Sequence, residues 1–269
     1  MLLSVIVAGC SQVFFQPTRI QVLAPDQLGL AYEDVRFRST DGLELHGWYL
    51  PARGKTVGTV LFLHGNAENI STHILGAAWM PARHFNVFLF DYRGYGASQG
   101  KPTFGGVQED IDAAMGTLVA RSDIDPNRII VFGQSLGGSL AVHYVAHTAY
   151  RDRIRMLVID SAFCSYTGIA REKLADHWLT WPFQWLASVA IDERFSPLPG
   201  VKLISPIPLL VIHGERDSIV PPHHALRLYD AALEPKQLWI VPGAGHIQAL
   251  QNESQQEKLT THMLEKVRD

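Results

Sequence analysis

The 269-residue sequence lacks several features that would assign it to a specialised class of protein. It has only two cysteines, Cys10 and Cys164, so a framework of several disulfides is excluded and at most one bridge can form. It has no block of like charges, no low-complexity segment and no repeat. Its first ten residues are apolar but too short to span a bilayer, and no later segment is long enough to cross one. The formal net charge of −3 gives no basic footprint for nucleic acid. With 47% hydrophobic and 18% charged residues, the chain has the composition of a globular protein with a large core.

Apolar runs suited to buried strands alternate with helical patterns along most of the chain. A hairpin is predicted over 33–50, with Ser39-Thr40-Asp41-Gly42 as its turn. The buried runs that follow are 59–63, 87–90, 129–132, 156–159, 209–212 and 237–241. We therefore predict an α/β fold, with about eight strands in a mostly parallel sheet and helices on both faces. We expect a single domain over 21–269, preceded by a signal and tether over 1–20.

The stretch Gly133-Gln134-Ser135-Leu136-Gly137 lies between one of these runs and a helical pattern. A Gly-x-Ser-x-Gly sequence between a strand and a helix is typical of a nucleophile elbow, a turn so sharp that the serine hydroxyl stands out above the sheet. Glycines flank the serine because a Cβ atom there would clash with the adjacent strand and helix. The alternative is an ordinary glycine-rich turn. The pattern predicts Ser135 as the nucleophile.

A serine nucleophile needs a histidine base and a carboxylate that orients the base. His246 is the best-placed histidine, because it follows the last strand in a glycine-rich loop. Asp217 follows the preceding strand, which gives the order Ser, Asp, His along the chain. Asp160, at the end of another strand, is the alternative acid. His64 is interpreted as structural, and His223-His224 as helix-start residues without a metal-ligand spacing.

The negative oxygen of an acyl-transfer intermediate needs N–H donors. Leu136 follows the nucleophile at the start of a helix and supplies one amide. The other is expected from Asn66, in the loop after an earlier strand, with Ala67 as the alternative.

From about residue 33 onward the chain resembles the α/β-hydrolase superfamily. The elbow, His64-Gly65-Asn66-Ala67, the segment 91–96 and Gly243-Ala244-Gly245-His246 carry this resemblance. The most similar subfamilies are the depalmitoylases with an abhydrolase domain and the small hydrolases resembling dipeptidyl peptidases. The resemblance implies an α/β-hydrolase fold and acyl-transfer chemistry, but it does not identify the substrate.

Residues 163–206 are too long for a simple connection between strands and are rich in aromatic residues. We expect a short helical cap that forms an acyl pocket, or alternatively aromatic side chains that only pack the insertion onto the domain. Cys164 is interpreted as a small buried hydrophobic residue.

The first ten residues are apolar, and Val7-Ala8-Gly9-Cys10 resembles a bacterial lipobox, in which the cysteine is lipidated. The first positive residue is Arg19, whereas signal peptides begin with positive charge, so the alternative is an ordinary apolar terminus. The resemblance predicts a lipid anchor at Cys10 in the cell envelope, on the periplasmic side of the outer membrane. The alternative location is the cytoplasm.

Taken together, the motifs predict a serine hydrolase that cleaves a small-molecule carboxylic ester or thioester through an acyl-enzyme. No metal, organic cofactor or nucleic acid is implied, and membrane contact is expected only through Cys10. The alternatives are an aminopeptidase or dipeptidase with the same triad and a non-catalytic binding protein on a hydrolase scaffold. The oligomeric state does not follow from the sequence.

Overall fold

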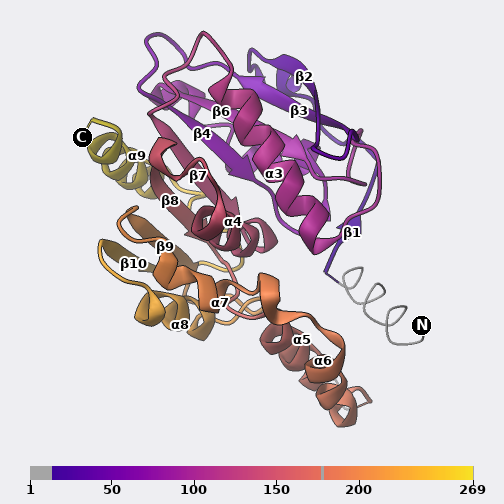
Figure 1. Ribbon diagram of the computed structural model, residues 1–269. Helices are drawn as coiled ribbons and strands as arrows, with labels where there is room; N and C mark the ends of the chain where they lie inside the picture. The colour runs from indigo at the N-terminus through magenta and orange to yellow at the C-terminus, as the bar shows by residue number, and fades with distance from the viewer. Residues whose placement is uncertain (1–13, 177–178, 269) are drawn as a thin grey trace.

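A computed structural model describes residues 14–176 and 179–268. Figure 1 shows a twisted sheet with helices on both faces, from which the helices α5 and α6 project at one end. The architecture predicted from the alternation of apolar runs and helical patterns is therefore confirmed.

The main sheet has eight strands in the order β10-β9-β8-β7-β4-β6-β3-β2. The strands are β2 (Glu33–Arg38), β3 (Glu44–Leu50), β4 (Gly58–Leu63), β6 (Phe85–Asp91), β7 (Ile129–Gln134), β8 (Ile154–Asp160), β9 (Leu209–Gly214) and β10 (Lys236–Val241). The predicted hairpin is β2 and β3, which pair antiparallel, and β3 also runs antiparallel to β6. The other neighbouring pairs are parallel, so the carboxyl ends of six strands meet at one edge, where ligands bind in such sheets.

Alternate side chains of the central strands enter two separate hydrophobic cores. In β4, Leu61 and Leu63 face the core that also holds buried residues of α3, α4 and α8. Val60 and Phe62 face the opposite core, which α9 covers. Because both faces are buried, the central strands are apolar throughout, which explains the continuous runs in the sequence.

The longer helices are α3 (Phe104–Val119), α4 (Leu136–His147), α5 (Tyr166–Ala175), α8 (His223–Ala231) and α9 (Glu253–Arg268). The shorter ones are α2 (Ile70–His73), α6 (Gln184–Ala190) and α7 (Pro197–Gly200). None of the helices in the described part of the chain has the length and apolar character needed to cross a membrane.

The insertion predicted over 163–206 contains two different parts. The helices α5 and α6, which we call the cap helices, project beyond the sheet (Figure 1). Farther along, α7 packs against α4, and Val201 and Ile204 are buried in the domain core. Only the first part of the insertion therefore forms a cap.

Candidate active site

The turn at Ser135 joins β7 to α4 and has the geometry expected of a nucleophile elbow. Ser135 has φ 54° and ψ −118°, a strained conformation for a non-glycine residue. A Cβ atom on Gly133 would lie 2.3 Å from the carbonyl oxygen of Gly137, and one on Gly137 would lie 2.1 Å from that of Leu63. The two glycines are therefore required by close contacts between backbones, as the sequence predicts.

The side chains of Ser135, His246 and Asp217 form a continuous hydrogen-bonded relay. His246 Nε2 lies 3.0 Å from Ser135 Oγ, and His246 Nδ1 lies 2.7 Å from Asp217 Oδ2. With the proton on Nδ1, the imidazole donates to Asp217 and presents its Nε2 lone pair to the serine hydroxyl. The structure thus brings the three predicted residues together in the order that proton abstraction from Ser135 requires.

Asp217 has a fully buried side chain and yet accepts several hydrogen bonds. Its Oδ1 accepts from the amides of Ile219 and Val220, both at 2.9 Å. His213 Nε2 donates to the carbonyl of Val220 and also lies 3.3 Å from Asp217 Oδ2. Burial alone would raise the pKa of Asp217, but the hydrogen bonds from His213, His246 and the Val220 amide hold it below its ordinary value. The carboxylate is therefore ionised behind His246.

Asp160, the alternative acid, occupies a different position. It is fully buried, and its oxygens accept from Gln134 Nε2 at 3.0 Å and Ser161 Oγ at 3.1 Å. Burial raises the pKa of Asp160 against the effect of these two hydrogen bonds. Ser161 Oγ in turn accepts from the amide of Ile247, next to the candidate base, at 3.0 Å. Asp160 thus belongs to a network that joins the residue before the nucleophile to the residue after His246.

The two predicted oxyanion donors, Asn66 and Leu136, border the same cavity as Ser135. The Leu136 amide lies at the N-terminus of α4, where the helix dipole favours negative charge. Asn66 is held in place on two sides, because Tyr95 donates its hydroxyl to the Asn66 carbonyl at 2.7 Å and the Gln16 amide donates to Asn66 Oδ1 at 2.9 Å. The loop is therefore preorganised beside the nucleophile.

The Gln16 contact belongs to an N-terminal segment that the sequence does not connect with the site. A short parallel pair joins β1 (Gln16–Pro17) to β5 (Ala67–Glu68), directly after Asn66. Phe14 is buried and packs edge-on against Tyr166 at 4.9 Å between ring centroids. The boundary expected at residue 20 thus falls after a segment that already forms part of the active-site wall.

A cavity of about 650 Å³ extends from Ser135 towards the cap helices. Its described lining is mostly apolar, and Lys173 is the one charged residue in it. The residues that line it are Phe14, Gln16, Asn66, Ser135, Leu136, Phe163, Ile169, Ala170, Lys173, Leu174, Thr180, Leu186, Ala187, Ile191, Ile219 and Val220. Its size is typical of a site for a small organic ligand.

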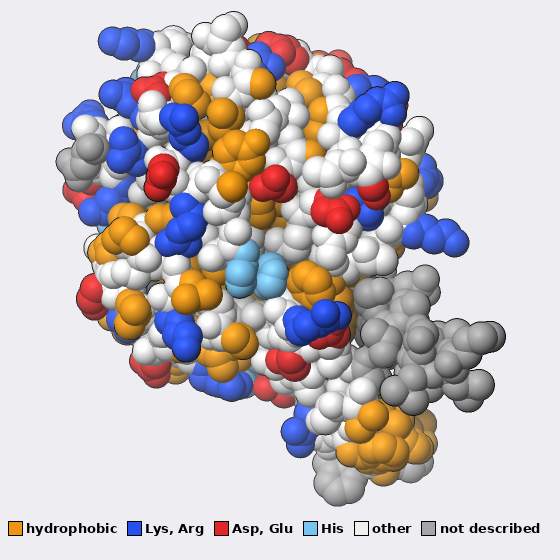
Figure 2. Space-filling view, viewed as in Figure 1, with side chains coloured by type: hydrophobic (Ala, Val, Ile, Leu, Met, Phe, Trp, Pro, Cys, Tyr) orange, Lys and Arg blue, Asp and Glu red, His pale blue; other side chains and the backbone are white. Residues whose placement is uncertain are grey.

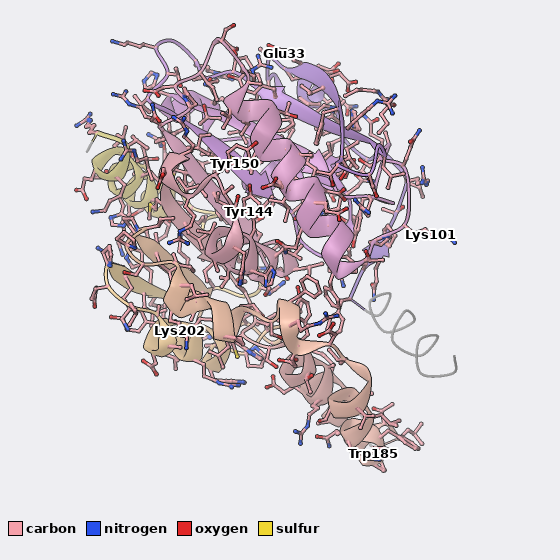
Figure 3. The ribbon with its side chains drawn as sticks, viewed as in Figure 1. Glu33, Lys101, Tyr144, Tyr150, Trp185 and Lys202 are labelled. Atoms are coloured by element: carbon pink, nitrogen blue, oxygen red, sulfur yellow. The ribbon has the colours of Figure 1, made fainter. Side chains whose placement is uncertain are left out.

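Of the described aromatic side chains of the insertion, Phe163 lines the cavity, but Phe183, Trp185 and Phe195 do not. Trp185 is 60% exposed and Phe183 is 51% exposed, and neither lines the cavity. Figure 3 shows Trp185 at the far end of the cap, and Figure 2 shows hydrophobic side chains gathered there. Phe195 instead stacks on Phe104 at 5.7 Å. Trp178 lies outside the described residues. Aliphatic side chains of α5 and α6 form the wall, because the helices turn these faces towards Ser135.

The remaining sequence candidates have structural positions or lie outside the description. His64 is fully buried and stacked on Tyr92 at 4.1 Å, and burial lowers its pKa well below the ordinary value. Cys164 is buried and unbridged, as the sequence indicates. Cys10 lies outside the described residues, so its lipidation stays a prediction.

Besides Phe14 and Gln16, sequence reasoning missed His213 and Ser161 as contributors to the site. His213 follows the apolar run of β9 and Ser161 follows that of β8, so both lie at the strand edge where the site gathers. The sequence indicates that both residues lie at the end of a strand, but it does not indicate that they contact Asp217 and Ile247.

Comparisons with known proteins agree with this geometry. The family described as serine aminopeptidase, S33, matches residues 54–203. The chain is 36% identical over 240 residues to the uncharacterized protein YfhR of Escherichia coli K12, covering 88% of this chain and 80% of that protein. It is also 36% identical over 218 residues to the alpha/beta hydrolase domain-containing protein WAV2 of Arabidopsis thaliana, covering 78% and 70% of the two chains.

A likeness to solved structures supports the same fold. The Pyrococcus furiosus esterase Pf2001 has a TM-score of 0.74 with 23% identity, over 95% of this chain and 97% of that chain. Given the matched span, the relatives and the sheet topology, this chain belongs to the serine aminopeptidase S33 family of α/β hydrolases.

Proposed function

We propose that this hydrolase cleaves a carboxylic ester or thioester through a covalent acyl-enzyme. The observation that supports this most strongly is the relay of Ser135, His246 and Asp217 at the wall of an apolar cavity. No metal or organic cofactor has a role in the proposed reaction.

In the proposed reaction Ser135 Oγ attacks the acyl carbon while His246 Nε2 takes the hydroxyl proton. The amides of Leu136 and Asn66 donate to the negative oxygen of the tetrahedral intermediate. The intermediate collapses as His246 gives its proton to the leaving alcohol or thiol. Water then attacks the acyl-serine by the same route, with His246 as the base, and releases the carboxylic acid.

The lining of the cavity favours an acyl substrate over a free amino terminus. An aminopeptidase needs a negative group near the scissile bond to bind the ammonium of its substrate. Among the described residues that line the cavity, the charged group is Lys173, whose ammonium is paired with Asp176 at 3.1 Å, so this lining presents no carboxylate to an ammonium. The family description makes peptide cleavage the alternative function.

Replacing the nucleophile tests the proposed acyl-enzyme. Because Ser135 has the hydroxyl that His246 faces, we expect Ser135→Ala to abolish labelling by a fluorophosphonate while the protein stays folded. Ser161→Ala is the comparison, because that serine also lies at a strand end near the site; this variant should still be labelled at Ser135, although more slowly, since Ser161 positions the residue next to His246. Undiminished labelling of folded Ser135→Ala would exclude the assignment. Absence of labelling in the wild type would favour the non-catalytic alternative.

A series of p-nitrophenyl esters tests the acyl pocket. We expect kcat/KM to peak at about four to eight acyl carbons, because each methylene that enters an apolar pocket adds at most about 0.8 kcal/mol until the chain meets the wall. Ala187→Leu should shift the optimum to shorter chains, since Ala187 lines the cavity. Val189→Leu is the matched control on the same helix, with an exposed side chain. Efficient cleavage of aminoacyl amides with negligible ester turnover would favour the peptidase instead.

For the cellular location we propose a lipid anchor at Cys10 in a bacterial envelope, on the periplasmic side of the outer membrane. The support is the Val7-Ala8-Gly9-Cys10 sequence. Mass spectrometry of protein from its bacterial host should find residues 1–9 removed and a diacylglyceryl group on Cys10. An unmodified Met1 in that protein would favour the cytoplasmic alternative.

A further inference from the structure

Glu172 on the cap helix α5 faces two consecutive histidines at the start of α8. Its two oxygens lie 3.0 Å from His223 Nε2 and 3.0 Å from His224 Nε2. The imidazole rings of the two histidines are stacked, with centroids 4.4 Å apart. Within the described ranges, this is the group of His, Cys, Asp and Glu side chains whose three ligand atoms all lie within 4.8 Å of one another.

The cluster is buried on one side and open on the other. His224 is fully buried, whereas the side chain of His223 is 48% exposed. Behind His224, its Nδ1 lies 3.2 Å from Cys164 Sγ and 3.3 Å from the Cys164 amide. A histidine that binds a metal through one ring nitrogen is usually held through the other, and Cys164 is placed for that second contact.

We propose that Glu172, His223 and His224 form a binding site for a divalent transition metal of the Zn²⁺ type, between the cap and the hydrolase domain. Two imidazole nitrogens and a carboxylate form a donor set that Zn²⁺ accepts, with water at the fourth position on the exposed side of His223. The proposed reaction does not use these residues, so the inference is independent of the proposed function.

Metal binding requires a defined change in hydrogen bonding at His224. In the described structure its Nδ1 accepts from the Cys164 amide, so Nε2 carries the proton and donates to Glu172. To ligate through Nε2, the ring must exchange this proton for one on Nδ1, which gives up the hydrogen bond from the Cys164 amide and leaves Cys164 Sγ, at 3.2 Å, as the acceptor. His223 must make the same exchange, because its Nε2 also lies 3.0 Å from a Glu172 oxygen. Each neutral imidazole loses one proton and gains one, so no net proton is released.

The donor atoms of the cluster limit the choice of ion. Glu172 is the one carboxylate among the three side chains, and the other two donors are imidazole nitrogens. A hard ion such as Mg²⁺ or Ca²⁺, which needs several oxygen ligands, does not fit this donor set.

A bound metal would fix one wall of the cavity. Glu172 lies on α5 among Ile169, Ala170, Lys173 and Leu174, which line the cavity on the other side of that helix. The metal would join α5 to α8 without approaching Ser135. Its role would therefore be to stabilise the cap.

The experiment uses the full chain without a polyhistidine tag, stripped with EDTA and dialysed. We would measure Zn²⁺ uptake by calorimetry, Co²⁺ binding by visible absorption, and thermal unfolding with and without Zn²⁺. The wild type should bind one ion per chain and melt at a higher temperature when it is loaded. His223→Ala should weaken binding at least about tenfold, and Glu172→Gln should weaken it as well.

His147→Ala is the matched control. His147 is also an exposed histidine stacked on another, His143, at 4.4 Å, but on α4. It should bind Zn²⁺ like the wild type, and both alanine variants should melt alike in EDTA because both side chains are exposed. The proposal is overturned if the wild type takes up no Zn²⁺ saturably, if His223→Ala binds it equally well, or if His147→Ala is the variant that loses binding.

Discussion

Replacing Asp217 by asparagine should inactivate the enzyme through a specific change of tautomer. The amides of Ile219 and Val220 both donate to Oδ1 of Asp217. In Asp217→Asn they select the amide oxygen for that position, so the NH₂ group takes the place of Oδ2 and faces His246 Nδ1. His246 must then accept there and carry its proton on Nε2, where it can no longer accept the proton of Ser135.

The expected loss follows from the serine proteases, where the corresponding change lowers kcat about 10⁴-fold. Four decades correspond to about 5 kcal/mol of activation free energy. Binding should change little, because Asp217 does not line the cavity. The measurement is kcat and KM for a p-nitrophenyl ester at pH 7 to 8, together with the rate of fluorophosphonate labelling.

Asp160→Asn is the control for this experiment. Asp160 is the other buried aspartate at the strand edge, and its raised pKa indicates an environment that favours a neutral group. Its asparagine variant should therefore keep kcat within about tenfold of the wild type, since both hydrogen-bonding partners can be retained. The reasoning is refuted if Asp217→Asn keeps more than a tenth of the wild-type kcat, or if Asp160→Asn is the more damaging change.

Three further predictions concern stability and positioning. Gly137→Ala should destabilise the fold by more than about 3 kcal/mol, because its Cβ would lie 2.1 Å from the carbonyl oxygen of Leu63. Gly105→Ala on α3, whose Cβ would make an ordinary contact with Phe195 Cζ at 3.8 Å, should stabilise it by about 0.5–1 kcal/mol. Urea unfolding measures both changes, and equal effects would contradict the steric argument. Ser161→Ala and Ser161→Gly both remove the hydroxyl that accepts from the Ile247 amide, so both should lower kcat and alter its pH profile while KM changes little. The glycine variant alone also relieves the strain of the positive φ of 57° at this position. An unchanged kcat in both variants would exclude a positioning role for Ser161. The pKa of Asp217 is lower in the folded state than the unfolded-state pKa of about 3.9. The ionised carboxylate therefore stabilises the fold at pH values above about 3.9, and this contribution is lost as the pH falls towards the folded-state pKa. The difference in unfolding free energy between the wild type and Asp217→Asn should thus be constant from pH 7 to 5 and shrink only below about pH 4.

The parts of this molecule that could be predicted are those whose cause is local in sequence. The strands were readable because burial on both faces makes each one apolar throughout, and the elbow because Gly133 and Gly137 are fixed by contacts within a few residues of Ser135 or with the adjacent strand. Asp217 and His246 were found from their place after strands, although their contact spans 29 residues.

The parts that could not be predicted depend on contacts between distant segments. Gln16 reaches Asn66 across 50 residues, and its amide carries no sequence signal. The composition of the insertion is the same whether its aromatic side chains face the cavity or the solvent, so the sequence does not decide between the two. The orientation of α6 decides it for Trp185. A chain shortened to begin near residue 20 would lack Phe14 and Gln16, so it would lose one wall of the cavity.

The position of Phe14 limits how far the active-site cavity can lie from a lipid on Cys10. Only four peptide units separate Cys10 from Phe14, and a fully extended chain spans at most about 14 Å over that distance. Phe14 lines the cavity that holds Ser135. If Cys10 carries a lipid, Phe14 and the cavity wall to which it belongs are therefore held within about 14 Å of the lipid attachment point.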